Sequence, residues 1–219
     1  MIARGRITGA SPNGLTISVP YDPRFVTQQW DEVQVDIPDG RTISPDQRRK
    51  AYALMGEIAA WAGMAQDEVK LTAKHEFVQR HLEGLHRELF SLADCDVTTA
   101  RLFISYLIDF VLEFDVPLRM PLLDVCDDIP KAVYACLMHK KCIVCGQKTE
   151  LHHVDRVGMG GDRHDMCHIG MECLPLCRTH HTEAHDHGDA ALMEKYHIVP
   201  VTIDKKIAQL YRLGRGGTP

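Results

Sequence analysis

Two short segments contain cysteine and histidine at the spacing of a zinc site. Two residues separate Cys142 from Cys145, and two separate Cys177 from His180. A two-residue gap lets both side chains of a tight turn point at one ion, and two such turns can complete a tetrahedral site. The pattern therefore predicts a structural Zn2+ held by three cysteines and one histidine.

Four more histidines lie close to these pairs and predict a second metal site. His181 and His185 are four residues apart, which places two imidazoles on one face of a helix. His152 could supply a third ligand from a strand, whereas His153 would point to the other face of that strand. A histidine beside a hydrated cation suits a general base, which takes a proton from the water that attacks a phosphate. A cluster of surface histidines without a shared role is the competing interpretation.

Composition indicates that the metal ligands belong to a separate C-terminal unit. Of the 219 residues, five of the eight cysteines lie within 142–177 and ten of the thirteen histidines within 139–197. No role is assigned to Cys167 or Cys173, and either could replace one of the four zinc ligands. No signal peptide or bilayer-spanning run is visible, so we expect a cytoplasmic protein without membrane contact, in which metal binding is favoured over disulfides. A net charge of −5 argues against a protein coated in positive charge.

The remaining patterns predict an α+β fold. Residues 1–38 indicate a small β region, because "RGRITG", "LTISV" and "EVQVDI" alternate apolar and polar residues. Helices are expected over 44–63, 66–82, 96–117 and 130–141. Ser44 and Gln47 form a capping box for the first helix, and Asp96 or Thr98 could cap the third. The third is apolar around most of its circumference, which is typical of a core helix or a dimer interface.

Residues 139–187 resemble the ββα-metal HNH nuclease module: a cysteine knuckle, "ELHHVD", a second knuckle and "HHTEAH". The resemblance implies that His152, His181 and His185 hold a catalytic cation and that His153 is the general base. It also implies that the zinc held by Cys142, Cys145, Cys177 and His180 takes no part in the chemistry. The implied catalytic cation is Mg2+ or Mn2+, with Ni2+ or Zn2+ as alternatives.

The sequence departs from the HNH pattern at one position. The Asn that usually braces the loop carrying the base is replaced by Glu172. His168 or Asp165 could take over this role. The loop between the two knuckles also carries Arg156 and Arg163, which could contact phosphate, although a solvated loop explains them equally well.

The region 35–118 resembles the Orf (NinB) recombination mediators of lambdoid phages, through "GRTISPDQRRKAYALMGEIA" and the later apolar helix. The whole arrangement resembles the HNHc nucleases of phage recombination gene clusters. This implies a homodimer that binds single-stranded or branched DNA and cooperates with single-strand-binding protein and a recombinase in a bacterial host. Four residues are candidates for phosphate contacts, although a solvated helix face explains them equally well: Arg41, Arg48, Arg49 and Lys50.

The sequence thus predicts an Orf/NinB-like DNA-binding and dimerisation domain over 1–120. A connecting segment and helix would follow over 121–138, a zinc-pinned HNH nuclease domain over 139–200 and a tail over 201–219. The predicted function is metal-dependent DNA cleavage in phage recombination. The alternatives are a non-catalytic single-stranded-DNA-binding mediator with an inactive HNH module, and an RNA-directed or toxin-like nuclease.

Overall fold

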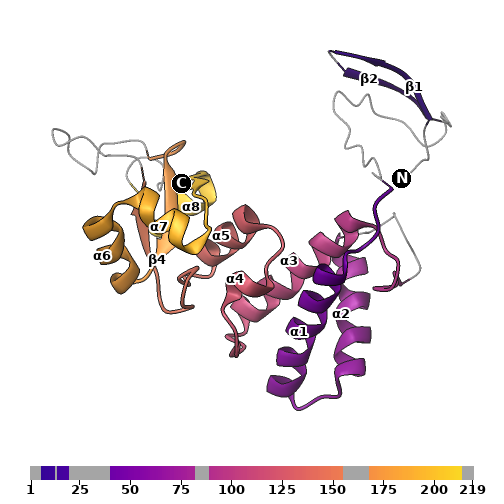
Figure 1. The fold of residues 1–219 in the computed structure, drawn as a ribbon, viewed down its shortest axis with the longest axis horizontal. Helices are drawn as coiled ribbons and strands as arrows, with labels where there is room; N and C mark the ends of the chain where they lie inside the picture. Colours follow the sequence, from indigo (N-terminus) through magenta and orange to yellow (C-terminus); the bar gives the residue numbers. More distant parts are fainter. Residues whose placement is uncertain (1–5, 13, 20–39, 82–88, 155–167, 214–219) are drawn as a thin grey trace.

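The computed structural model describes residues 6–12, 14–19, 40–81, 89–154 and 168–213 (Figure 1). At the N-terminus, β1 (Arg6–Ser11) and β2 (Gly14–Ser18) pair as an antiparallel hairpin with an irregularity between Ile7 and Gly9. These strands confirm the first two expected ones. The third, "EVQVDI", lies outside the described residues.

The first helix, α1 (Pro45–Ala62), begins and ends where the sequence predicts. The Ser44 side chain accepts a hydrogen bond from the backbone N–H of Gln47, and the Gln47 side chain accepts one from the backbone N–H of Ser44. Gly63 ends the helix in the left-handed conformation, with φ of 66°. That conformation strains residues with a β-carbon, so a glycine at this place is a strong stop signal.

Two further helices, α2 (Gln66–His81) and α3 (Val97–Glu113), pack with α1. Asp96 caps α3 by accepting from the backbone N–H of Thr99 at 2.8 Å. Phe103 on α3 is fully buried, and its ring centroid lies 5.3 Å from that of Phe77 and 5.1 Å from that of Phe90. Most of α3 is therefore buried in the core of a single chain. Among the described helices, none is long and apolar enough to cross a bilayer.

Two shorter helices, α4 (Leu122–Val125) and α5 (Ile129–Met138), lie between the helical part and the C-terminal unit (Figure 1). α5 contacts α3 on one side and β4 on the other. The Gln47 side chain adds a polar connection, because its amide donates to the Asp127 carboxylate at 2.7 Å. The start of α1 is thus joined to Asp127, which lies two residues before the first residue of α5.

The C-terminal unit contains a three-stranded antiparallel sheet in the order β3 (Glu150–His153), β4 (Glu172–Leu176) and β5 (Val201–Thr202). His152 pairs with Leu174, and His153 pairs with Cys173. The helix α6 (Arg178–His187) follows β4, then α7 (Asp189–Tyr196) and α8 (Lys205–Tyr211). The elements β3, β4 and α6 have the order of the expected ββα module.

The expectation of a tail from residue 201 needs correction. Up to residue 213 the chain is folded onto the C-terminal unit, with Ile203 and Ile207 fully buried. The Tyr134 hydroxyl of α5 donates to the Asp204 carboxylate at 2.8 Å, and the Tyr211 hydroxyl donates to the Leu137 carbonyl at 2.9 Å. Both β5 and α8 are too short to give a clear periodic pattern, so neither was predicted.

We expect Phe103→Ala to reduce the free energy of unfolding by about 3–5 kcal/mol, because a buried aromatic ring leaves a cavity that the neighbouring rings only partly fill. Thermal unfolding followed by circular dichroism measures this loss. Leu71→Ala is the control, since Leu71 on α2 is 59% exposed and should change stability little. An unchanged midpoint for Phe103→Ala would show that the aromatic cluster is not part of the core.

Candidate functional site

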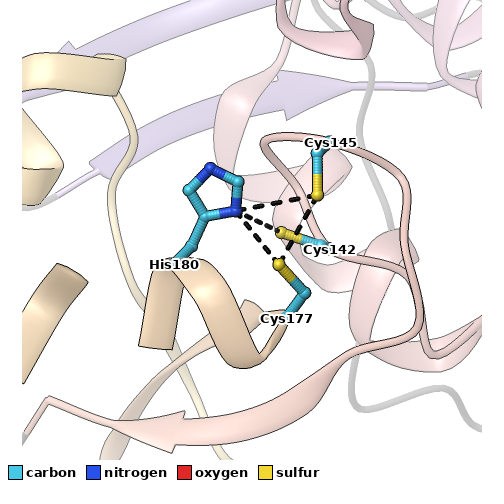
Figure 2. Close-up of side chains that lie close together, drawn as sticks. All are labelled: Cys142, Cys145, Cys177 and His180. Atoms are coloured by element: carbon cyan, nitrogen blue, oxygen red, sulfur yellow. Dashed lines mark hydrogen bonds between the residues drawn. The ribbon is translucent and has the colours of Figure 1, made fainter. Parts of the chain in front are cut away.

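Cys142, Cys145, Cys177 and His180 converge on one point (Figure 2). The Nδ1 atom of His180 lies 3.5, 3.6 and 3.1 Å from the sulfurs of Cys142, Cys145 and Cys177. The sulfurs of Cys145 and Cys177 are 3.6 Å apart. Ligand atoms arranged tetrahedrally at zinc bond lengths would be separated by roughly 3.5–3.8 Å. The arrangement therefore fits a tetrahedral zinc ion.

Local backbone structure explains how each pair is formed. The first pair lies in a tight turn in which the backbone N–H of Gly146 donates to the Cys142 carbonyl at 2.8 Å. Gly146 has φ of 70°, a conformation that glycine adopts without strain. In the second pair, Cys177 is the N-cap residue of α6, and His180 lies in its first turn. A gap of two residues brings both side chains of each pair to the same side.

The electrostatics of these four groups favour a cation. Burial raises the pKa of the Cys142 thiol to about 12. Burial also opposes ionisation of Cys177, but hydrogen bonds with the His180 backbone and ring and with the two other thiols lower its pKa to about 7. Three thiolates at these separations would repel one another, and a bound cation removes that repulsion. A structural zinc is thus the ligand that this set would hold.

A second group consists of His152, His181 and His185. The ring centroid of His152 lies 4.6 Å from that of His181 and 5.4 Å from that of His185, and the two α6 rings are 4.9 Å apart. One ligand atom from each residue lies within 4.8 Å of the others. Three protein ligands leave coordination positions for water or substrate, which is typical of a catalytic metal site.

Hydrogen bonds to carboxylates occupy one nitrogen in two of these rings. His152 Nε2 lies 2.7 Å from the Asp189 carboxylate, and His181 Nδ1 lies 2.9 Å from the Glu150 carboxylate. An ionised carboxylate only accepts, so each histidine donates there, which leaves its other nitrogen available to a metal. His152 Nδ1 is buried and has no hydrogen-bond partner in the described structure. A buried nitrogen of this kind fits a metal ligand. Burial also lowers the pKa of His152, against the opposing effect of Asp189, which favours the neutral, ligating ring.

His153 leaves β3 on the other face from His152, as strand alternation predicts. Its Nε2 lies 2.9 Å from Nδ1 of His168, and the two ring centroids are 4.9 Å apart. His168 is only 5% exposed, whereas His153 is half-buried. Glu172 occupies the position of the usual Asn at the start of β4, where it pairs with Thr202. Of the two proposed replacements, His168 contacts His153 and Asp165 lies outside the described residues.

The four basic residues near the start of α1 do not form one exposed cluster. Arg48 is half-buried and donates to the Ala93 carbonyl at 2.6 Å. Lys50 is half-buried and pairs with Asp46 at 2.9 Å and with Asp127 at 3.8 Å. Arg49 also pairs with Asp46 but remains exposed, as does Arg41. Arg41 and Arg49 are therefore the members accessible to a ligand.

The structure describes one of the two cysteines to which the sequence assigns no role. Cys173 is fully buried in the core and is a member of neither metal cluster, and burial raises its pKa to about 12. Cys167, Arg156 and Arg163 lie outside the described residues. Asp189 was missed in the sequence because a lone aspartate at a helix start indicates capping rather than contact with a histidine.

We expect the purified protein to retain about one tightly bound zinc per chain, and Cys177→Ala to lose it together with much of the stability of the C-terminal unit. Structural zinc contributes ~10–16 kcal/mol of binding free energy in zinc-finger peptides, and this energy is coupled to folding. Elemental analysis after dialysis against a weak chelator and thermal unfolding measure both effects. Cys95→Ala is the control, because Cys95 is half-buried and outside both clusters. Retention of zinc by Cys177→Ala would exclude the proposed ligand set.

Comparison with protein families gives an independent result. The family model described as "Putative HNHc nuclease" matches residues 25–214. Comparisons with curated proteins and with solved structures found no match. The matched range includes α1 to α3 as well as the ββα unit, so it is not restricted to the nuclease motif. Because the match extends over most of the sequence, the chain belongs to this HNHc nuclease family.

Proposed function

We propose that the protein is a divalent-metal-dependent DNA endonuclease that hydrolyses phosphodiester bonds. The observation that carries the proposal is the convergence of His152 from β3 with His181 and His185 from α6, next to a second strand histidine, His153. Membership of a nuclease family supports the same activity. In this proposal, the Cys142, Cys145, Cys177 and His180 set holds a structural zinc.

The three converging histidines would hold the catalytic cation. When bound, the cation would stabilise the negative charge that develops on the phosphate and the leaving oxygen. Imidazole ligands without a carboxylate are typical of Zn2+, Ni2+ and similar ions, whereas Mg2+ prefers oxygen ligands. A test of activity therefore has to include Mn2+, Ni2+ and Zn2+ besides Mg2+.

His153 would act as the general base that takes a proton from the attacking water. It follows His152 directly in β3, so the base and the metal ligand are held by the same piece of backbone. His168 would orient the base in place of the usual Asn, through the ring-to-ring hydrogen bond of 2.9 Å. A buried partner restrains a ring well, because water does not compete for the hydrogen bond.

We further propose that the substrate is single-stranded or branched DNA in phage recombination, in the cytoplasm of a bacterial host. The support is the resemblance of residues 35–118 to the Orf/NinB mediators. The same resemblance supports a homodimer that cooperates with single-strand-binding protein and a recombinase. Arg41 and Arg49 would contact phosphates, since both are exposed. Arg48 and Lys50 would contribute less, because both are half-buried as well as held by internal partners.

We expect His153→Ala to lower the rate of DNA cleavage by about 10²–10⁴-fold, which is the usual contribution of a general base. Zinc content and thermal stability should remain those of the wild type. Labelled single-stranded, duplex and Holliday-type DNA would be incubated with each protein and Mg2+, Mn2+, Ni2+, Zn2+ or EDTA. His187→Ala is the control, since His187 is an exposed histidine in the last turn of α6.

Cleavage by His153→Ala at the wild-type rate would disprove the base assignment. Wild-type protein that binds DNA but cuts none of these substrates with any metal would favour the non-catalytic mediator. Glu172 in place of the family Asn is the observation that favours this second function.

We expect the double change Arg41→Gln and Arg49→Gln to weaken DNA binding by a similar factor for all sequences. Each lost phosphate contact should reduce the slope of log K against log salt by ~0.7 for single strands or ~0.9 for duplex. Fluorescence anisotropy across a salt series measures both quantities. Arg80→Gln on α2 is the control of like charge, since this side chain is 64% exposed. An unchanged salt slope in the double variant would place the DNA contacts elsewhere.

A further inference from the structure

We propose that Asp189 is a positioning residue that turns His152 Nδ1 toward the catalytic cation and thereby sets the affinity of the three-histidine site. Neither the family match nor the HNH resemblance assigns a role to this aspartate. The inference rests on the proposed role of His152, His181 and His185 as metal ligands.

The chain turn between α6 and α7 brings Asp189 to its position. Gly188 ends α6, with its backbone N–H donating to the Ala184 carbonyl at 2.8 Å, and it has φ of 89°. The left-handed backbone at this glycine lets α7 start immediately, so Asp189 is its first residue. The aspartate thus lies four residues after His185 in the chain and 2.7 Å from His152 on β3.

The hydrogen bond selects one form of the His152 ring. The Asp189 carboxylate accepts, so Nε2 carries the proton and Nδ1 carries the lone pair. Nδ1 is buried and unpartnered in the described structure, and the residue as a whole is only 2% exposed. The ring centroid lies 4.6 Å from that of His181 and 5.4 Å from that of His185, so Nδ1 is the nitrogen that remains available to a cation shared with them.

A carboxylate behind a metal-bound histidine fixes the ring and makes it a stronger ligand. His181 also has a carboxylate partner, Glu150, but that side chain is 48% exposed and is shared with Arg178 at 3.6 Å. The Asp189 side chain is 31% exposed, and its histidine is buried. Water competes less at Asp189, so its influence on the metal site should be the larger of the two.

Mn2+ binding is the first test, with free Mn2+ followed by electron paramagnetic resonance in protein that keeps its structural zinc. We expect Asp189→Ala to raise the Kd for Mn2+ by about 10–100-fold. Asp189→Asn should fall between this variant and the wild type, since its amide can still accept from Nε2. Glu194→Gln removes one negative charge from an exposed position on the same helix and should match the wild type. His181→Ala removes one of the three proposed ligands, so its titration shows how much Mn2+ binds without the site.

The form of the His152 ring is a second test that needs neither added metal nor activity. Two-bond 15N–1H correlation spectra of protein that keeps its structural zinc, with no metal added for the histidine site, should show His152 protonated at Nε2 in the wild type. The Asp189→Ala spectrum should show a mixture of both neutral forms, at unchanged zinc content and circular dichroism. A wild-type ring protonated at Nδ1 would overturn the inference, as would an Asp189→Ala variant with wild-type Mn2+ affinity.

The two proposals can fail separately. Protein that binds Mn2+ through the three histidines but cuts no DNA would overturn the proposed nuclease activity and leave the role of Asp189 standing. Cleavage by the wild type, together with unchanged Mn2+ affinity in Asp189→Ala, would overturn the role of Asp189 and leave the proposed nuclease activity standing.

Discussion

The convergence of Cys142 and Cys145 with Cys177 and His180 is the constraint on which the C-terminal unit depends. The first pair lies a few residues before β3, and the second forms the start of α6. Joining these two points fixes the start of the helix against the strand, so the position of every later α6 residue relative to β3 follows. His181 comes directly after the last zinc-type ligand, and His185 is one turn further on. In a small unit with short strands, a metal staple at this point would add to the stability that apolar burial provides.

The second constraint is the alternation of side chains along β3. Two adjacent residues of one type, His152 and His153, enter different environments because successive strand residues face opposite sides of the sheet. One ring is buried against α6 with its outer nitrogen bound by Asp189. The other is half-buried with His168 as its partner. Identical side chains can therefore take different chemical roles without any insertion between them.

The sequence predicted the features that depend on neighbours in the chain. The capping box of Ser44 and Gln47, the stop at Gly63, the Asp96 cap and both metal-type pairs involve residues no more than a few positions apart. Contacts between distant residues were not predictable in this way. Asp189 and His152 are 37 positions apart, and Gln47 and Asp127 are 80 apart. The basic residues of α1 illustrate the limit, because their spacing suggested one exposed face while distant partners hold Arg48 and Lys50. The same limit hid β5 and α8, whose burial depends on α5 and β4.

The position of α5 has a consequence for how the two parts of the chain work together. Its buried residues include Val133 and Leu137, which are fully enclosed, and the helix contacts α3, β4, β5 and α8. The next residues after it lead into the first cysteine pair without an intervening linker. Gln47 and Lys50 bind Asp127 just before α5, so the start of α1 is attached to the same helix from the other end. A rotation of the helical part relative to the nuclease unit would have to break this buried packing. The two parts are therefore not free to move like two domains on a flexible linker. A DNA strand bound near Arg41 and Arg49 would be held at a fixed distance from the histidine cluster.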